Sequence, residues 1–302
     1  MRRRDYRYAY DGAGNRVSQT VNGQTKSYSY NAANQLTAAG ATTYAYDANG
    51  NETGNSAGRS ASYNAANQLT SITPAGGSAI AMTYAGVGQT ERAAAGATSF
   101  TRNGLGLGVE TTSGASTYYT RDSSGALLGQ RRPEGKHYYL LDALGSVVGV
   151  TDGAGKLAAT YRYGPFGELA SSTGSVVNAW RFAGEYQDTG GLYKIGERYY
   201  DPTLGRWTQQ DPLRQVTDPT QVNRYPYAGD DPVNNVDPSG CGKRQVWQCL
   251  RRWCPIAAAQ ACARLMPLPW VGAYAVAACA AVVAPACAWW CYRTYRNRNR
   301  FP

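Results

Sequence analysis

The first part of the chain alternates tyrosine with small or polar residues in short runs, and each run ends at Asp or Asn. An alternation with a period of two predicts a β-strand with one face turned inward. A Gly/Asn turn and an apolar residue follow each run, a pattern typical of a β-hairpin. The pattern recurs at steps of 20, 16 and 17 residues, at Tyr10-Asp11, Tyr30-Asn31, Tyr46-Asp47 and Tyr63-Asn64.

Composition also favours sheet over helix in the first 240 residues. This part holds 33 of the 35 glycines and 21 of the 24 tyrosines, whereas Phe, Met and Leu are scarce. A chain with few aliphatic side chains must build its core from tyrosine rings and β-branched residues, which favour strands. We therefore predict an all-β fold in which the repeats form one sheet, because a single hairpin cannot bury its own face.

The stretch from Arg198 to Gly240 interrupts this pattern with Asp-Pro steps. Each proline removes an amide donor and disfavours helix at the residue before it, so the stretch cannot be a regular helix. We expect a turn-rich strip whose aromatic rings pack inward and whose aspartates cap turns. The five steps begin at Asp201, Asp211, Asp218, Asp231 and Asp237.

Two segments of this strip, "RYYDPTLGRWTQQDP" and "NRYPYAGDDPVNNVDPSG", resemble the Rhs-repeat-associated core. That core closes the Rhs and tyrosine-aspartate (YD) repeat proteins, which include bacterial polymorphic toxins and the shells of insecticidal toxin complexes. The blocks "HYYLLDALGSVVGVTD" and "YRYGPFGE" extend the resemblance, which covers about Tyr6 to Gly240. It implies a spiral β-hairpin shell, whereas the periodicity alone leaves an open β-solenoid as an alternative.

The resemblance also suggests a division of the chain into three regions. We expect a YD-repeat shell segment at 1–135, the Rhs-associated core at 136–240, and a variable C-terminal cargo region at 241–302. The chain opens inside a repeat, and only about four clear repeats follow. We therefore expect the C-terminal part of a longer protein, with the rest of the shell supplied by a longer chain or a neighbouring polypeptide. No signal peptide is visible, because the basic Met1 to Asp5 is not followed by an apolar run.

In this family the core releases its cargo by aspartyl autoproteolysis, which requires two carboxylates close enough to share a proton. The resemblance implies Asp211 and Asp237 as this pair, with Arg206 as a charge partner that holds one of them ionised. Asp201 and Asp218 are the reserve candidates. The expected cut follows Cys241, so that the cleavage site comprises Gly240, Cys241 and Gly242.

The sequence departs from the family pattern at two places near this site. Cys241 stands where leucine is usual, and "LRQVTDPTQV" lengthens the spacing between Asp211 and Asp237 to 26 residues. The alternative interpretation is that these aspartates only cap turns, as Asp before Pro commonly does. His137 is the only histidine, so we expect neither a zinc site nor a hydrolase triad, and no cofactor.

The tail differs from the rest of the chain in charge and in cysteine content. Residues 241–302 carry nine Lys or Arg, no acid and all seven cysteines, which suggests disulfides with one cysteine left over. An uncharged run of 28 residues lies between Arg264 and Arg293, with tryptophans near both ends. Such a run predicts a membrane-active helix. A helical cargo of other action and an inert remnant are the alternatives, and no nucleic-acid partner is expected.

Two functions fit these observations. The first is a polymorphic toxin fragment whose shell encloses its own C-terminal segment and releases it by cutting near Cys241, with an immunity protein and a target-cell membrane as further partners. The second is a cell-surface YD-repeat adhesion protein, anchored by a C-terminal membrane helix and not cleaved. Both place the protein outside the cell or in the envelope of a bacterium.

Overall fold

The computed structural model describes residues 4–85, 91–123, 125–212 and 223–240, all within the first of the chain's two units, Met1–Cys241. These residues form 22 strands and two short 3₁₀ helices, so the all-β prediction is confirmed for them. The predicted C-terminal cargo region at 241–302, with its membrane helix, lies outside the described residues. Within the described part we find no helix with the length and apolar character needed to cross a bilayer.

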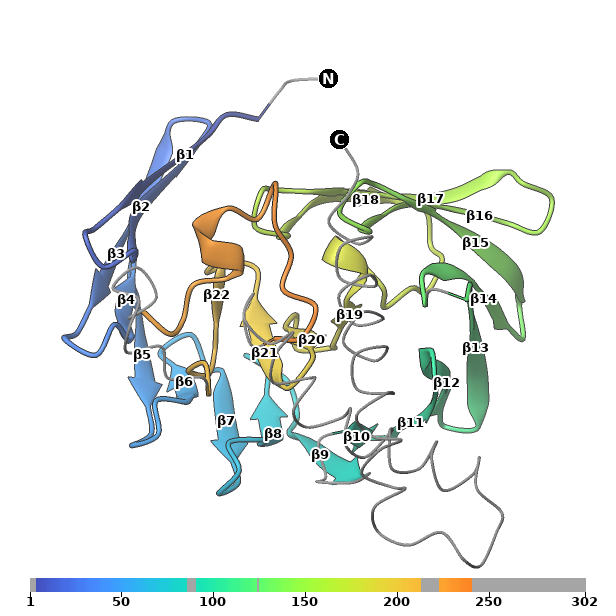
Figure 1. Ribbon diagram of the computed structural model, residues 1–302, viewed down its shortest axis with the longest axis horizontal. Helices are drawn as coiled ribbons and strands as arrows, with labels where there is room; N and C mark the ends of the chain where they lie inside the picture. Colours follow the sequence, from blue (N-terminus) through green and yellow to red (C-terminus); the bar gives the residue numbers. More distant parts are fainter. Residues whose placement is uncertain (1–3, 86–90, 124, 213–222, 241–302) are drawn as a thin grey trace, which may run out of the picture. The chain divides into compact units, whose positions relative to one another are not determined.

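Eighteen strands follow one another as an antiparallel meander in one curved sheet (Figure 1). Each strand pairs with the next one along the chain. The strands are β1 Tyr6–Tyr10, β2 Arg16–Val21, β3 Gln24–Tyr30, β4 Leu36–Ala39, β5 Thr42–Tyr46, β6 Glu52–Asn55, β7 Ser60–Tyr63, β8 Leu69–Thr73, β9 Ile80–Ala85, β10 Glu91–Ala95, β11 Thr98–Asn103, β12 Gly106–Thr112, β13 Ala115–Arg121, β14 Leu127–Arg132, β15 Gly135–Leu141, β16 Val147–Thr151, β17 Leu157–Tyr163 and β18 Leu169–Thr173.

The Asp or Asn of each repeat closes a turn with its side chain. In the third repeat, Asp47 Oδ1 accepts the N–H groups of Asn49 and Asn51, both at 2.9 Å. Gly50 lies between them at φ +79°, a conformation that glycine adopts without strain. The Asp47 side chain thus forms an Asx turn, in which a carboxylate oxygen accepts N–H groups as a backbone carbonyl would. The same pair of bonds is made by Asp11, Asn31, Asn64, Asp142 and Asp152.

Tyrosine hydroxyls join neighbouring strands on the inner side of the sheet. A tyrosine near the end of one strand donates to the carbonyl of the first residue of the preceding strand. Satisfying the hydroxyl in this way lets the ring be buried without a loss of hydrogen bonding. The bonds are Tyr30 to Arg16 at 2.9 Å, Tyr84 to Leu69 at 2.8 Å and Tyr163 to Val147 at 2.7 Å.

A second, four-stranded sheet lies on the inner side of the first (Figure 1). Its strands are β19 Tyr186–Gln187, β20 Tyr193–Ile195, β21 Arg198–Asp201 and β22 Arg206–Trp207, with η1 Phe182–Gly184 before them and η3 Ala228–Asp230 after them. The predicted inward rings are almost fully buried, and the tilted rings of Tyr200 and Tyr227 pack with centroids 4.3 Å apart. All four residues of β21 are buried, so both faces of this strand are covered.

The strip from Arg198 to Gly240 lies against the turns of the first four repeats. Its side chains bond to turn residues of each repeat, which ties the inner sheet to the outer one. These bonds run from Asn223 to Ala13, from Arg206 to Asn34, from Tyr225 to Gly50 and from Gln209 to Asn67.

The large sheet runs across the expected boundary between residues 135 and 136. That boundary falls at the first residue of β15, which pairs with β14, and the large sheet continues to Thr173. The reason is that the repeats after Lys136 make the same hairpins and Asx turns as the earlier ones, with Asp142 and Asp152 in the turns.

Candidate active site

Arg198 lies at the centre of the candidate site. It is the first residue of β21, it is 3% exposed, and its guanidinium stacks on the ring of Trp207 at 4.1 Å. One of its terminal nitrogens lies 2.9 Å from Asp211 Oδ2 and 3.4 Å from Asp237 Oδ2. The two carboxylate oxygens are therefore no farther apart than the sum of these distances. The structure thus brings together the two aspartates that the sequence singled out.

Asp211 is held by its backbone as well as by its side chain. Its N–H donates to the carbonyl of Arg224 at 2.9 Å, and the Arg224 guanidinium donates back to the carbonyl of Asp211. The side chain is 17% exposed, compared with 4% for that of Arg198. This carboxylate is therefore fixed in position yet still open to water.

Asp237 begins a tight turn that ends at Gly240. The Gly240 N–H donates to the Asp237 carbonyl at 3.2 Å, and Ser239 Oγ donates to Asp237 Oδ1 at 3.1 Å. The carbonyl of Gly240 in turn accepts a hydrogen bond from Arg198 Nε. One guanidinium therefore contacts both carboxylates and the peptide chain directly before the predicted cut.

This arrangement combines the groups that hydrolysis of a peptide needs. A carboxylate can activate water, a second carboxyl can supply a proton, and a buried cation can hold the peptide carbonyl and stabilise negative charge. Of the two contacts of the guanidinium with the carboxylates, the one with Asp211 is the shorter.

The other predicted site residues lie elsewhere. Arg206 was expected to be the charge partner of the aspartates, but in the structure its guanidinium donates to Asn34 at 2.7 Å and stacks between the rings of Tyr30 and Tyr225. Arg198 takes the expected place. Arg206 is drawn away because β22 carries it to the turns of the large sheet.

The remaining residues of the predicted set divide between a different ion pair and the undescribed part of the chain. Asp201 is a buried turn cap: its Oδ1 accepts the N–H of Thr203 at 2.9 Å and that of Leu204 at 3.2 Å. Asp218, Cys241 and Gly242 lie outside the described residues.

A second arginine, Arg59, also holds two carboxylates. It lies 2.7 Å from Asp201 Oδ2 and contacts Glu52, so it joins β6 of the large sheet to β21 of the small one. Burial raises the pKa of Glu52 to about 7, although Arg59 opposes this rise. Burial also acts to raise the pKa of Asp201, but Arg59 and the turn N–H groups outweigh it and lower that pKa.

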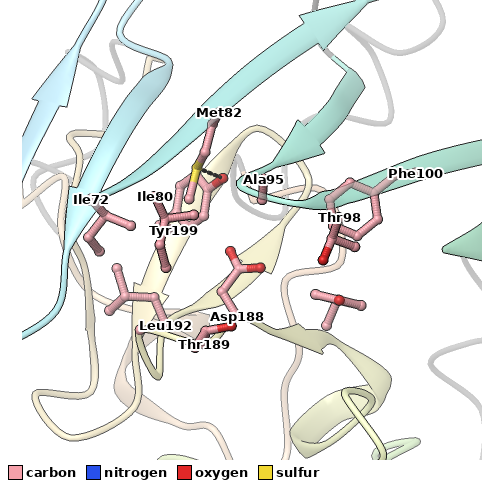
Figure 2. Close-up of a pocket in the computed structure, with 12 residues that line it drawn as sticks. Ile72, Ile80, Met82, Ala95, Thr98, Phe100, Asp188, Thr189, Leu192 and Tyr199 are labelled. Atoms are coloured by element: carbon pink, nitrogen blue, oxygen red, sulfur yellow. Dashed lines mark hydrogen bonds between the residues drawn. The ribbon is translucent and has the colours of Figure 1, made fainter. Parts of the chain in front are cut away.

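A small pocket lies between β8–β11 and the inner sheet (Figure 2). Figure 2 shows the Asp188 carboxylate directed into it, and the Tyr199 hydroxyl bonded to Met82 Sδ at 3.0 Å. Asp188 forms an ion pair with the buried Arg92, which stacks on Phe100 at 4.4 Å. This pair is a further link between the two sheets, and the pocket does not include Arg198, Asp211 or Asp237.

Comparison with known proteins agrees with this architecture. Residues 109–233 match the family described as the teneurin YD-shell. The chain is also 31% identical over 250 residues to the tRNA3(Ser)-specific nuclease WapA of Bacillus spizizenii, which covers 77% of this chain. This chain belongs to the Rhs and YD-repeat shell proteins. Its Tyr-Asp turns and Asp-Pro strip are therefore features of a YD shell.

Other YD-repeat relatives have different names and match a shorter part of the chain. The salivary gland surface protein 1 of Aedes aegypti is 39% identical over 118 residues, or 38% of this chain. The double-stranded DNA deaminase toxin A of Burkholderia cenocepacia is 36% identical over 109 residues, or 34% of this chain. The chain covers 11% of WapA, 3% of the surface protein and 7% of the deaminase toxin. It is thus short compared with all three.

Proposed function

We propose that this chain is part of a YD-repeat toxin, in which the β-shell encloses the region after Cys241 and releases it by cutting itself. The observation that carries the proposal is the contact of one buried guanidinium with Asp211, Asp237 and the carbonyl of Gly240. An aspartate that only capped a turn would not need a second carboxylate and the junction peptide at the same cation.

The proposed roles follow from the contacts. Asp211 is the more exposed carboxylate and the one closer to Arg198, so we assign to it the activation of the attacking water. We assign to Asp237 the polarisation of the carbonyl of the scissile bond after Cys241. Arg198 holds the chain one peptide before that bond through the Gly240 carbonyl. Arg206 supports the site indirectly, because it ties β22 to the turn at Asn34.

The relatives support a shell whose cargo varies. Proteins named as a tRNA nuclease and as a DNA deaminase toxin both match this chain, although their named activities differ. We propose that the activity of the toxin lies in the variable region, here 241–302. Its uncharged run between Arg264 and Arg293 supports a membrane-active effector, for which an immunity protein and a target-cell membrane are the partners. Such a protein acts outside the producing cell.

The test is the intact mass of the full chain carrying a C-terminal tag, beside the Asp237→Asn variant. Self-cleavage predicts two fragments from the wild type, the smaller containing the 61 residues Gly242–Pro302 and the tag, and one uncut mass from the variant. A single uncut mass from both proteins contradicts the proposal.

The match to a surface protein favours a second candidate, a YD-repeat adhesion protein that stays intact and is anchored by its C-terminal region. Fractionation of cells that express the tagged chain separates the two. The full-length mass in the membrane fraction supports the anchored protein, whereas a tagged fragment of the tail alone supports the released effector.

A further inference from the structure

We infer that Gly196, in the turn between β20 and β21, is a positioning residue for the self-cleavage: it lets the junction chain at Ser239–Gly240 reach Arg198. The inference rests on the proposed function. It adds a residue that lies before the Asp-Pro strip and takes no part in the chemistry itself. The turn and the junction chain come into backbone contact, and both carry glycine at the point of closest approach.

The two glycines leave no room for side chains. Gly196 has φ +52°, and a Cβ there would overlap the carbonyl of Ser239. Gly240 has φ +65°, and a Cβ there would overlap the carbonyl of Ile195. In both cases the obstructing atoms belong to the backbone, so a side chain could be accommodated only if one chain segment moved away from the other.

The turn also supplies the guanidinium. Gly196 and Glu197 connect Ile195 to Arg198, which pair across the hairpin. The backbone of Gly196 therefore lies against the carbonyl of Ser239. Two residues later, the side chain of Arg198 donates to the carbonyl of Gly240. A shift of the junction chain away from Gly196 would also carry the Gly240 carbonyl away from Arg198.

A buried lysine also holds the turn at Gly196. Lys194 Nζ donates to the carbonyl of Gly196, and the side chain is almost fully buried beside the ring of Tyr199. The turn is therefore held in place and cannot easily move back to make space for a side chain at position 196. The junction chain would have to move instead.

The experiment compares Gly196→Ala with Gly191→Ala in the full 302-residue chain. Gly191 lies in the turn before β20 at φ +82°, but no atom lies within 4 Å of a Cβ placed there. Alanine at 191 therefore introduces backbone strain without the overlap. Each chain is synthesised in a cell-free system, and the cut fraction is followed by mass from the end of synthesis.

We expect Gly191→Ala to cut at close to the wild-type rate and Gly196→Ala to cut about 100-fold more slowly, the loss typical of a displacement of about 1 Å. A wild-type rate in Gly196→Ala or an equal loss in both variants would overturn the inference. An uncut wild-type chain would instead overturn the proposed function, and the inference with it.

Discussion

Two clusters in this protein share one design, an arginine between two carboxylates, yet they differ in what else the arginine contacts. Arg59 binds Glu52 and Asp201, which are both almost fully buried. Arg198 binds Asp211 and Asp237 and also the carbonyl of Gly240. The guanidinium of Arg59 bonds to these two carboxylates. The guanidinium of Arg198 contacts a peptide of the junction and a carboxylate that water can reach.

Charge alone therefore does not distinguish a structural link from a candidate site. The Arg59 cluster joins the two sheets. Among the described residues, its carboxylates do not contact the chain at Ser239–Gly240. The Arg198 cluster lies within the Asp-Pro strip, where it joins residues 198, 211 and 237–240. We therefore expect substitutions in the first cluster to change stability and those in the second to change cleavage.

The largest expected effect comes from replacing each arginine by lysine. Lysine keeps the charge but loses the planar fork that reaches several oxygens. Arg198→Lys should slow self-cleavage by about 100- to 1000-fold, the range for loss of one preorganised donor, whereas Arg59→Lys should cut at nearly the wild-type rate. The cut fraction is measured by intact mass over time. Equal rates in the two variants would remove the distinction between the clusters.

A second comparison concerns stability. Arg59→Met leaves Asp201 buried without its cation, which we expect to cost about 3–5 kcal/mol of unfolding free energy. The measurement is the urea midpoint at pH 7, with Arg7→Met as the control, since Arg7 pairs with Asp5 at the exposed surface. The control should change stability by less than about 1 kcal/mol. A small effect of Arg59→Met would mean that the two sheets do not depend on this link.

The third comparison uses pH. The pKa of Glu52 is raised by burial to about 7 from an ordinary 4.5, so the folded protein binds its proton more tightly than the unfolded chain. The contribution of Glu52 to the free energy of unfolding is therefore complete below pH about 4.5 and is lost as pH rises through about 7. Glu52→Gln should remove a pH-dependent loss on the order of 1–3 kcal/mol across this window. Unfolding midpoints at pH 5 and pH 8 measure it, and an unchanged pH slope in the variant would contradict it.

The smallest expected effect lies in the repeats. Tyr163→Phe removes the bond to the Val147 carbonyl and should cost about 0.5–1.5 kcal/mol, because the buried acceptor loses its partner. Tyr138 is half exposed, so Tyr138→Phe is the matched control and should have almost no effect. Thermal unfolding of both variants is sufficient for the comparison. Equal effects would indicate that the inward hydroxyls do not stabilise the sheet.

Much of the fold could be predicted from sequence because it is built from local signals. Each Tyr-Asp or Tyr-Asn step defines a strand end and the turn after it, and Asp47 closes its turn with bonds to residues two and four positions later. The inward packing of the rings in the strip also followed from their type. These features need no knowledge of the distant parts of the chain.

The site could be predicted only in part, because it depends on contacts across 13 and 39 residues. The motif pointed to Asp211 and Asp237, which the structure brings to one guanidinium, but the predicted charge partner was Arg206, and nothing in the sequence indicated Arg198. Strand alternation could not separate the two arginines, since all residues of β21 and β22 are buried and neither strand has a solvent face. The stacking of Arg198 on Trp207 is a property of the folded hairpin and leaves no local pattern.

The most direct test of this account compares two buried aspartates of the same strip, each bound to an arginine. Asp237→Asn and Asp201→Asn are both nearly isosteric, and the intact mass of each full chain shows whether it has cut near Cys241. We expect one uncut mass for Asp237→Asn and two fragments for Asp201→Asn. Two fragments from Asp237→Asn would contradict self-cleavage at this site, because the Arg198 cluster would then be no more than a second structural link.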